Sequence, residues 1–265
     1  MTQYSSNITV MLKAARCASR KLIRDFGEVE NLQVSRKGPK DFVTAADLRA
    51  EKEIVNSLQY ARPEYPILAE ESGLIAGSDK RFRWLVDPLD GTTNFMHGMP
   101  MFSITIALEE ILPNGKSEIV AAVTDSPIYK ETFWAEKGNG AWLESGDRNG
   151  SQRLRVSNRK KLIDSLLCVG SISKDLSDNN LVAEFSAVRC IGSTALGLAY
   201  TAAGRFDCFL QKSAQAWDYG AGILLVKEAG GTVTDINGKD KMLQDKSIIA
   251  TNEELHAHVS KCLRA

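Results

Sequence analysis

The sequence predicts a mixed α/β fold in which helices and mixed β-sheets pack in layers. Segments with apolar residues at helical spacing alternate along the chain with short apolar runs bounded by turn residues. This alternation is typical of layered α/β architectures. The chain has 265 residues, enough for one large domain or two closely packed ones with a substantial core.

The first half of the chain predicts two helices and most of the strands. An amphipathic helix over 8–26 is followed by Gly27, a typical helix stop. Thr44 and Asp47 form a capping pattern that starts a second helix near residue 45. Around these helices we expect a loop or short hairpin over 34–47, strands over 66–72, 82–88, 102–108 and 118–128, and a hairpin over 131–143.

A polar and basic stretch at 144–161 predicts a boundary between two halves. We expect residues 1–145 to form an α+β half and residues 146–265 an α/β half, joined in one compact catalytic unit. The second half predicts strands over 166–171, 206–210, 231–236 and 247–252, and helices over 193–204, 219–230 and 252–263.

Composition excludes several classes of protein. Lysines plus arginines number 33, as do aspartates plus glutamates, so no global basic field favours direct nucleic-acid binding. The five cysteines are widely spaced without a C-x-x-C pair, which argues against a disulfide framework or a zinc site. The N-terminus does not resemble a signal peptide, and no apolar run approaches the roughly 18 residues of a membrane span. We therefore expect a cytoplasmic protein that makes no membrane contact.

Carboxylates stand at the ends of predicted strands and at the start of one helix. Glu70 and Glu71 end one strand, Asp87 and Asp90 end the next, and Asp218 begins a helix of the second half. Ligands tend to bind at the carboxyl ends of strands in open α/β sheets. Gathered carboxylates repel one another unless a cation joins them, and hard oxygen ligands favour Mg²⁺. The sequence therefore predicts a magnesium site.

The turn after the strand over 82–88 has the composition of a phosphate cradle. Pro88 lacks a backbone N–H and ends the strand, which lets the carbonyl of Leu89 face the same ion. Gly91 allows a close backbone approach to a ligand. Thr92 and Thr93 stand where a helix begins, and free backbone N–H groups there attract phosphate.

Each of these residues also has an ordinary structural interpretation. An aspartate at a strand end usually forms a cap or an Asx-turn. Glu70 and Glu71 alone would be solvated loop acids, and Asp218 alone would be the N-cap of its helix. Asp47 is likewise the acid of a capping box. Only the co-occurrence of these residues favours the metal interpretation.

Seven segments together resemble the inositol monophosphatase family of magnesium-dependent, lithium-sensitive sugar phosphatases, and within it the bacterial SuhB-like members. The segments are WLVDPLDGTTNF, LAEES, WDYGAGILLVKEAGG, KGPKDFVTAAD, NFMHGMPMFSITIAL, FWAEKGNGAWL and IGSTALGLAYTAAGRFD. The resemblance extends over roughly residues 8–255. It implies a layered α-β-α-β-α sandwich and a homodimer.

The resemblance also implies a role for each matching residue. Glu70, Asp87 and the carbonyl of Leu89 would hold one Mg²⁺, and Asp87, Asp90 and Asp218 a second, with a third ion on Glu70 and waters. Asp47 and Thr92 would act with Glu70 in catalysis by positioning the attacking water. The phosphate would be bound by Asp90, Gly91, Thr92 and Asp218, and the polyol by Gly192, Ser193, Thr194 and Gln211. Glu71 would lie behind the metal ligands, and Lys37 would lie in a mobile loop.

The implied reaction is the hydrolysis of myo-inositol 1-phosphate and related polyol phosphates. Gln211 departs from the family pattern, because many members have a glutamate there that contacts the inositol hydroxyls. Adenosine 3′,5′-bisphosphate, fructose 1,6-bisphosphate and histidinol phosphate, which relatives also hydrolyse, are therefore alternative substrates. Some bacterial relatives also contact the transcription machinery, which leaves a non-catalytic role as a third hypothesis.

Overall fold

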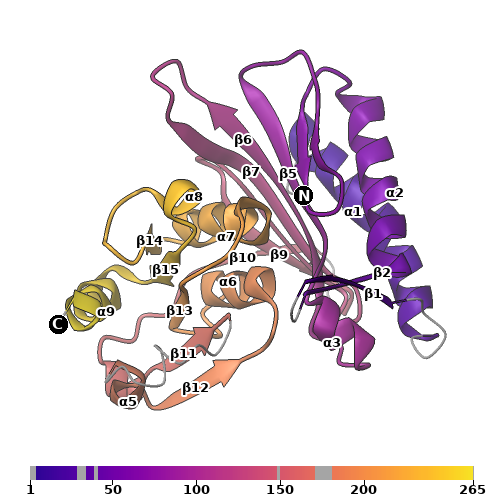
Figure 1. Ribbon diagram of the computed structural model, residues 1–265. Helices are drawn as coiled ribbons and strands as arrows, with labels where there is room; N and C mark the ends of the chain where they lie inside the picture. The colour runs from indigo at the N-terminus through magenta and orange to yellow at the C-terminus, as the bar shows by residue number, and fades with distance from the viewer. Residues whose placement is uncertain (1–3, 29–33, 39–40, 148–149, 171–180, 265) are drawn as a thin grey trace.

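The computed structural model of the chain describes residues 4–28, 34–38, 41–147, 150–170 and 181–264. Two sheets dominate the described part, and Figure 1 shows helices on both sides of the larger one. The larger sheet has eight strands in the order β10 (Ser151–Arg153), β9 (Gly140–Ser145), β8 (Glu131–Glu136), β7 (Ser117–Ser126), β6 (Ser103–Ile111), β5 (Phe82–Asp90), β3 (Ile67–Ala69) and β4 (Gly73–Ile75).

The smaller sheet belongs to the second half of the chain. Its five strands in the described residues run in the order β12 (Ala187–Cys190), β11 (Leu166–Val169), β13 (Cys208–Gln211), β15 (Ile248–Thr251) and β14 (Thr232–Thr234). A separate antiparallel hairpin consists of β1 (Val34–Gly38) and β2 (Asp41–Thr44). The helical segments are α1 (Ser6–Phe26), α2 (Ala45–Ala61), α3 (Thr92–Met96), the 3₁₀ turn η2 (Leu162–Asp164), α5 (Leu181–Glu184), α6 (Thr194–Ala202), α7 (Ala216–Glu228), α8 (Met242–Asp245) and α9 (Glu253–Arg264).

Side-chain packing orders these elements into five layers. Alternate residues of β5 point to opposite faces of the large sheet: Trp84 and Val86 pack among residues of α1 and α2, whereas Leu85 packs among residues of α6 and α7. The apolar cluster around Leu85 continues to Phe209 of the small sheet. Leu210, the next residue, faces the opposite side with residues of α5 and α9. The predicted α-β-α-β-α sandwich is confirmed.

The predicted boundary stretch contributes to the large sheet. Ser151–Arg153 pair antiparallel with β9, and the backbone N–H of Leu154 donates to Ala141 at 2.8 Å. Leu154 itself is buried in the cluster between the sheets. The polar composition of this stretch reflects an exposed edge strand, and the division of the chain near residue 145 stays a prediction.

Candidate functional site

Two neighbouring parallel strands bring Glu70 and Asp87 to one edge of the large sheet. β3 and β5 pair in register, with Ala69 beside Val86. The pairing continues one residue further, because the backbone N–H of Glu70 donates to the carbonyl of Val86 at 3.1 Å. Glu70 and Asp87 therefore leave their strands side by side, close enough for Glu70 to raise the pKa of Asp87.

The antiparallel ladder between β5 and β6 is interrupted between Asp87 and Asp90. Asp87 stands opposite Thr105 and Asp90 opposite Ser103, with an irregularity between them. Pro88, which has no N–H to donate, occupies this interruption, as proline in a sheet normally does. Within it the backbone N–H of Leu89 donates to Oδ1 of Asp87 at 2.9 Å. The bulge thus brings two carboxylates to the end of one strand.

Gly91 makes the turn from β5 into α3 possible. Its φ is +100°, a conformation that residues with a side chain rarely adopt. A Cβ there would stand 2.9 Å from the carbonyl oxygen of Met101 and 3.3 Å from that of Gly192. Both conformation and space therefore require glycine, which agrees with the close approach predicted from the sequence. Phosphate binding at Gly91 stays a prediction.

Thr92 connects the turn to α2. Its Oγ1 lies 3.1 Å from Oδ1 of Asp47 and 3.1 Å from the carbonyl oxygen of Leu89, and it can donate to either. Asp47 is fully buried, and its Oδ2 accepts from the backbone N–H of Thr44 at 2.8 Å in a capping box. Burial raises the pKa of Asp47 above its ordinary value, against the effect of its hydrogen bonds. The predicted Asp47–Thr92 pair is thus in contact.

Asp90 joins the two halves of the chain. Its carboxylate accepts from the backbone N–H of Thr194 at 3.2 Å and of Ala195 at 2.7 Å, and from the hydroxyl of Ser193. These donors form the N-terminus of α6, where a negative charge is favourable. Burial nevertheless prevails and raises the pKa of Asp90 to about 6. Ser193 and Thr194, predicted to contact the substrate, therefore also hold Asp90.

Asp218 enters the site from the first turn of α7. Gln215, not Asp218, is the N-cap residue, and its backbone N–H donates to Oδ2 of Asp218 at 2.7 Å. The carboxylate is therefore fixed three residues into the helix. Burial, followed by repulsion from Asp90 and Glu70, raises the pKa of Asp218 to about 8. The last of the four predicted carboxylates thus shares an electrostatic environment with the others.

The charge of this cluster fits a cation. The pKa of Asp87 is raised well above its ordinary value, first by burial and then by Glu70, Asp90 and Asp218. In the described residues, no lysine or arginine is among the largest contributions to the pKa of Asp87, Asp90 or Asp218. A group of oxygen-ligand side chains that raise one another's pKa has the chemistry of a Mg²⁺ site.

The carboxylates are nonetheless not arranged as a finished coordination shell. Within the described ranges, no three histidine, cysteine, aspartate or glutamate side chains form a group that could hold a metal ion as they stand. Mutual repulsion separates like charges, so the side-chain rotamers at a strand end would change when a cation arrives. The backbone places the ligands together, and the metal positions of Glu70, Asp87, Asp90 and Asp218 stay predictions.

Glu51 is a site-forming residue that the sequence interpretation missed. It is buried on α2, one turn after Asp47. Its carboxylate accepts from the backbone N–H of Glu71 at 2.8 Å and of Ser72 at 2.9 Å. It therefore holds the segment that follows Glu70. The only signal in the sequence was the i, i+4 spacing of two acids on one helix face.

Asn94 is a second missed residue. Its Nδ2 donates to the carbonyls of Met101 and Ile191, each at 2.7 Å, which ties α3 to the segment before α6. Gly192 has a φ of +71°, and a Cβ there would lie 2.9 Å from the Asn94 side chain. Gly192 therefore passes close to the end of β5, as a substrate contact would require.

Gln211 and Lys37 were also predicted to belong to the site. Gln211 ends β13 and is buried, with Nε2 donating to the carbonyl of Ser213 at 2.7 Å. Its Oε1 has no hydrogen-bond partner in the described residues and lies where a Cβ on Gly170 would be. Lys37 lies in β1, not in a loop, and its side chain is outside the described part.

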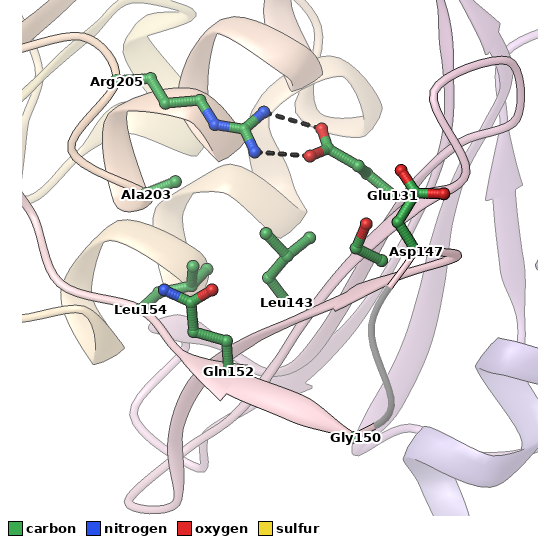
Figure 2. Close-up of a pocket in the computed structure, with 9 residues that line it drawn as sticks. Glu131, Leu143, Asp147, Gly150, Gln152, Leu154, Ala203 and Arg205 are labelled. Carbon is green, nitrogen blue, oxygen red and sulfur yellow. Dashed lines mark hydrogen bonds and ion pairs between the residues drawn. The ribbon is translucent and has the colours of Figure 1, made fainter.

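A cavity of about 350 Å³ elsewhere in the molecule is lined by none of these residues. Figure 2 shows Arg205 and Glu131, two of its lining residues, joined directly by hydrogen bonds, with Leu143 near the pair. The guanidinium donates to both carboxylate oxygens, at 2.7 and 2.5 Å. Both charges are thereby neutralised, so this cavity belongs to the junction between the halves and not to the carboxylate cluster.

Comparison with known proteins shows which sequences and structures the chain is similar to. The chain matches the sequence model of the Inositol monophosphatase family over residues 3–264. It is 45% identical over 268 residues to a Mesorhizobium japonicum protein named inositol-1-monophosphatase, and the match covers 98% of this chain and 97% of that protein.

In the described residues, no helix is both long and apolar enough to cross a membrane.

Two further relatives have SuhB names. A Pseudomonas aeruginosa protein named Nus factor SuhB is 38% identical, with 97% of this chain and 93% of that protein covered. The crystal structure of the extragenic suppressor protein SuhB from Bartonella henselae superposes with a TM-score of 0.89 at 47% identity, covering 98% of this chain and 99% of that one.

Proposed function

The chain belongs to the inositol monophosphatase family, and on this premise we propose that it is a Mg²⁺-dependent phosphatase of myo-inositol 1-phosphate and related small polyol phosphates. The observation that supports this reaction most strongly is the shared environment of Asp87, Asp90, Asp218 and Glu70 at the end of β5. Such a cluster would hold two or three Mg²⁺ ions. When bound, the ions neutralise the phosphate charge and lower the pKa of water.

We propose that Asp47 and Thr92 position the attacking water. The Thr92 hydroxyl can donate to Asp47, 3.1 Å away, which leaves its oxygen free to accept a hydrogen bond from water. As the water attacks, its proton would pass to the Thr92 oxygen while Thr92 gives its own hydroxyl proton to Asp47. The raised pKa of Asp47 makes it a stronger base for this transfer than an ordinary aspartate. The backbone N–H groups at the start of α3 would face the phosphate.

The test of this proposal is phosphate release by the Asp90→Asn variant. Asparagine keeps the shape and can still accept from Ala195, so the fold should persist while a charged ligand is lost. We expect kcat/KM for inositol 1-phosphate to fall at least about 100-fold, equivalent to about 2.7 kcal/mol. Asp164→Asn makes the same chemical change at an exposed position and should have no effect. Turnover that persists in Asp90→Asn, or in the wild type with EDTA, would refute the site.

The choice among polyol phosphates rests on Gln211. Its Nε2 is engaged by Ser213, so Oε1 is the atom that would accept from a substrate hydroxyl. A neutral amide accepts more weakly than the carboxylate typical of the family. A panel of kcat/KM values for inositol 1-phosphate, fructose 1,6-bisphosphate, adenosine 3′,5′-bisphosphate and histidinol phosphate decides the substrate. The Gln211→Glu variant should have a higher kcat/KM for inositol 1-phosphate than the wild type, without the same increase for the other three substrates.

A second candidate function is a contact with the transcription machinery, which the Nus factor names of relatives favour. If this contact does not need turnover, Asp90→Asn should complement a strain that lacks the gene. Failure of that inactive variant, alongside rescue by the wild type, would count against the role.

We further propose that the protein is a cytoplasmic homodimer. Light scattering of the purified protein measures its mass and so tests the dimer.

A further inference from the structure

A cavity of about 690 Å³ lies outside the carboxylate cluster. Its walls come from the start of β7, from the C-terminal half of α7 and from a segment that includes α8. Figure 1 shows α8 beside α7, on the side of the large sheet opposite α1 and α2. The volume is within the range of sites for small organic ligands.

The floor of the cavity is apolar. Ile119 of β7 and Ile223 and Leu224 of α7 line it, each about 5% exposed or less. Met242 and Leu243 of α8 complete it. An apolar molecule that covered this floor would leave water, a favourable change in proportion to the area buried.

The rim of the cavity is charged, and part of that charge is already neutralised. Lys137 pairs with Glu118 and Lys227 with Asp240. Glu228 accepts from two backbone N–H groups of the β8–β9 turn, each at 2.8 Å. These groups therefore do not recruit a ligand.

Three lysines of the rim are not neutralised. Lys116, Lys239 and Lys241 are exposed and form no ion pair with any carboxylate in the described part of the chain. One acid of the lining, Asp245, is also without an ion pair there. Glu228 keeps its negative charge, so the lining has five lysines against four carboxylates and a net charge of +1, beside an apolar floor.

We propose that this cavity binds a small amphipathic organic anion, with an apolar ring or short chain on the Ile119–Leu224 floor and a carboxylate, sulfonate or phosphate at Lys239 and Lys241. Charge complementarity and the apolar floor together select this class over a neutral or cationic ligand. Asp218 precedes Ile223 and Leu224 on α7 by about 8–9 Å along the helix axis and does not line the cavity. Binding is therefore independent of divalent ions at the carboxylate cluster.

The probe is 8-anilinonaphthalene-1-sulfonate, an aromatic ring system with one sulfonate, titrated by fluorescence into the full chain. We expect saturable 1:1 binding that EDTA leaves unchanged. The Lys239→Glu/Lys241→Glu variant should bind roughly 10-fold more weakly, because two favourable charges become repulsive. The Lys80→Glu/Lys161→Glu variant makes the same net charge change at exposed positions away from the cavity and should bind like the wild type.

A second variant tests the apolar floor independently of charge. Leu243→Ser, at a partly buried position, should also weaken binding while the melting temperature shows that the fold is kept. Absence of saturable binding, or equal affinity in the wild type and the Lys239/Lys241 variant, would overturn the proposal. The proposal would also be overturned if light scattering gave a dimer mass for the wild type and a monomer mass for the Lys239→Glu/Lys241→Glu variant, because this face would then be a dimer interface.

Discussion

At the scale of single residues, the site is a place where burial and repulsion oppose ionisation. Asp90 retains hydrogen bonds from the N-terminus of α6 and still has a pKa of about 6, whereas Asp218, with one backbone donor, reaches about 8. The difference follows the number of donors that stabilise the charged form. A fold that keeps these carboxylates together is therefore under electrostatic strain near neutral pH unless a cation is bound.

This strain predicts a pH dependence of stability in the absence of divalent ions. The folded-state pKa of Asp218 exceeds its unfolded value of about 3.8, so the folded chain binds more protons between pH 4 and about 8. The contribution of Asp218 to stability is therefore complete below pH 4 and lost as the pH rises through 8. Denaturant unfolding of the wild type and of Asp218→Asn, in EDTA, should give free energies that diverge with rising pH in favour of the variant.

The same comparison with saturating Mg²⁺ is the control. Cation binding stabilises the ionised carboxylates, so the advantage of Asp218→Asn should disappear or reverse. Parallel pH curves for the two proteins in EDTA would mean that Asp218 is not held near the other acids.

The acids of the site were predictable because their chemistry is local. A proline, a glycine and two aspartates within five positions signal a strand end that can approach a ligand. Glu51 and Asn94 were not predictable, because each holds a segment that is distant in the sequence, as in Glu51–Glu71 and Asn94–Ile191. Only the folded chain shows that these ordinary polar residues hold the loops of the site.

At the scale of elements, α2 carries two acids on the face toward the site. Asp47 contacts Thr92 and Glu51 holds the segment after β3, so a single helix positions both sides of the cluster. β3 and β5 supply the parallel edge from which Glu70 and Asp87 emerge. The large sheet and α2 therefore form a frame around the proposed metal ligands.

Glu51→Ala should disturb this frame without touching the reacting atoms. The N–H groups of Glu71 and Ser72 would lose their acceptor, and the segment beside Glu70 would no longer be held. We expect the Mg²⁺ concentration for half-maximal activity to rise roughly 10-fold, because about 1.4 kcal/mol of the free energy of Mg²⁺ binding is lost when Glu70 is no longer held in position. Glu51→Gln, which keeps one acceptor oxygen, should recover part of this loss.

Glu53→Ala is the matched control, since Glu53 lies on the same helix and pairs with Lys21 of α1 instead. An equal change in Mg²⁺ dependence for both alanine variants would indicate a general weakening of α2. Only a selective effect at Glu51 supports the positioning role.

The long helices and strands were predictable, as were the short strands β3, β11, β13, β14 and β15, whereas β4, β10 and β12 were not. α1, α2 and β5–β7 each show a clear apolar period over nine or more residues. β4, β10 and β12 have three or four residues, too few for a period, and each forms by pairing with a neighbouring strand of its sheet. For such segments tertiary pairing decides the structure.

At the scale of the whole molecule, the active centre depends on the junction between the two sheets. Asp218 and the α6 N-terminus belong to the second half, whereas the strand ends belong to the first. The pair Arg205–Glu131 bridges this junction (Figure 2). The guanidinium of Arg205 also lies 4.7 Å from the centre of the Tyr200 ring.

Arg205→Ala should lower the free energy of unfolding by about 1–2 kcal/mol, since a bidentate ion pair and a cation–π contact are lost together. Urea unfolding followed by tryptophan fluorescence measures this change. Arg189→Ala removes an exposed guanidinium that donates only to its neighbour's carbonyl, and should be nearly neutral. If both variants unfolded at the same urea concentration, Arg205 would not stabilise the junction.

The convergence of Glu70, Asp87, Asp90 and Asp218 around divalent ions is the central claim, and one measurement tests it most directly. Crystals soaked in Mn²⁺, a stand-in for Mg²⁺, report the ions through anomalous scattering. We expect two or three anomalous peaks bounded by the four carboxylates, close to the carbonyl of Leu89. Peaks elsewhere in the molecule, or none at the end of β5, would contradict it.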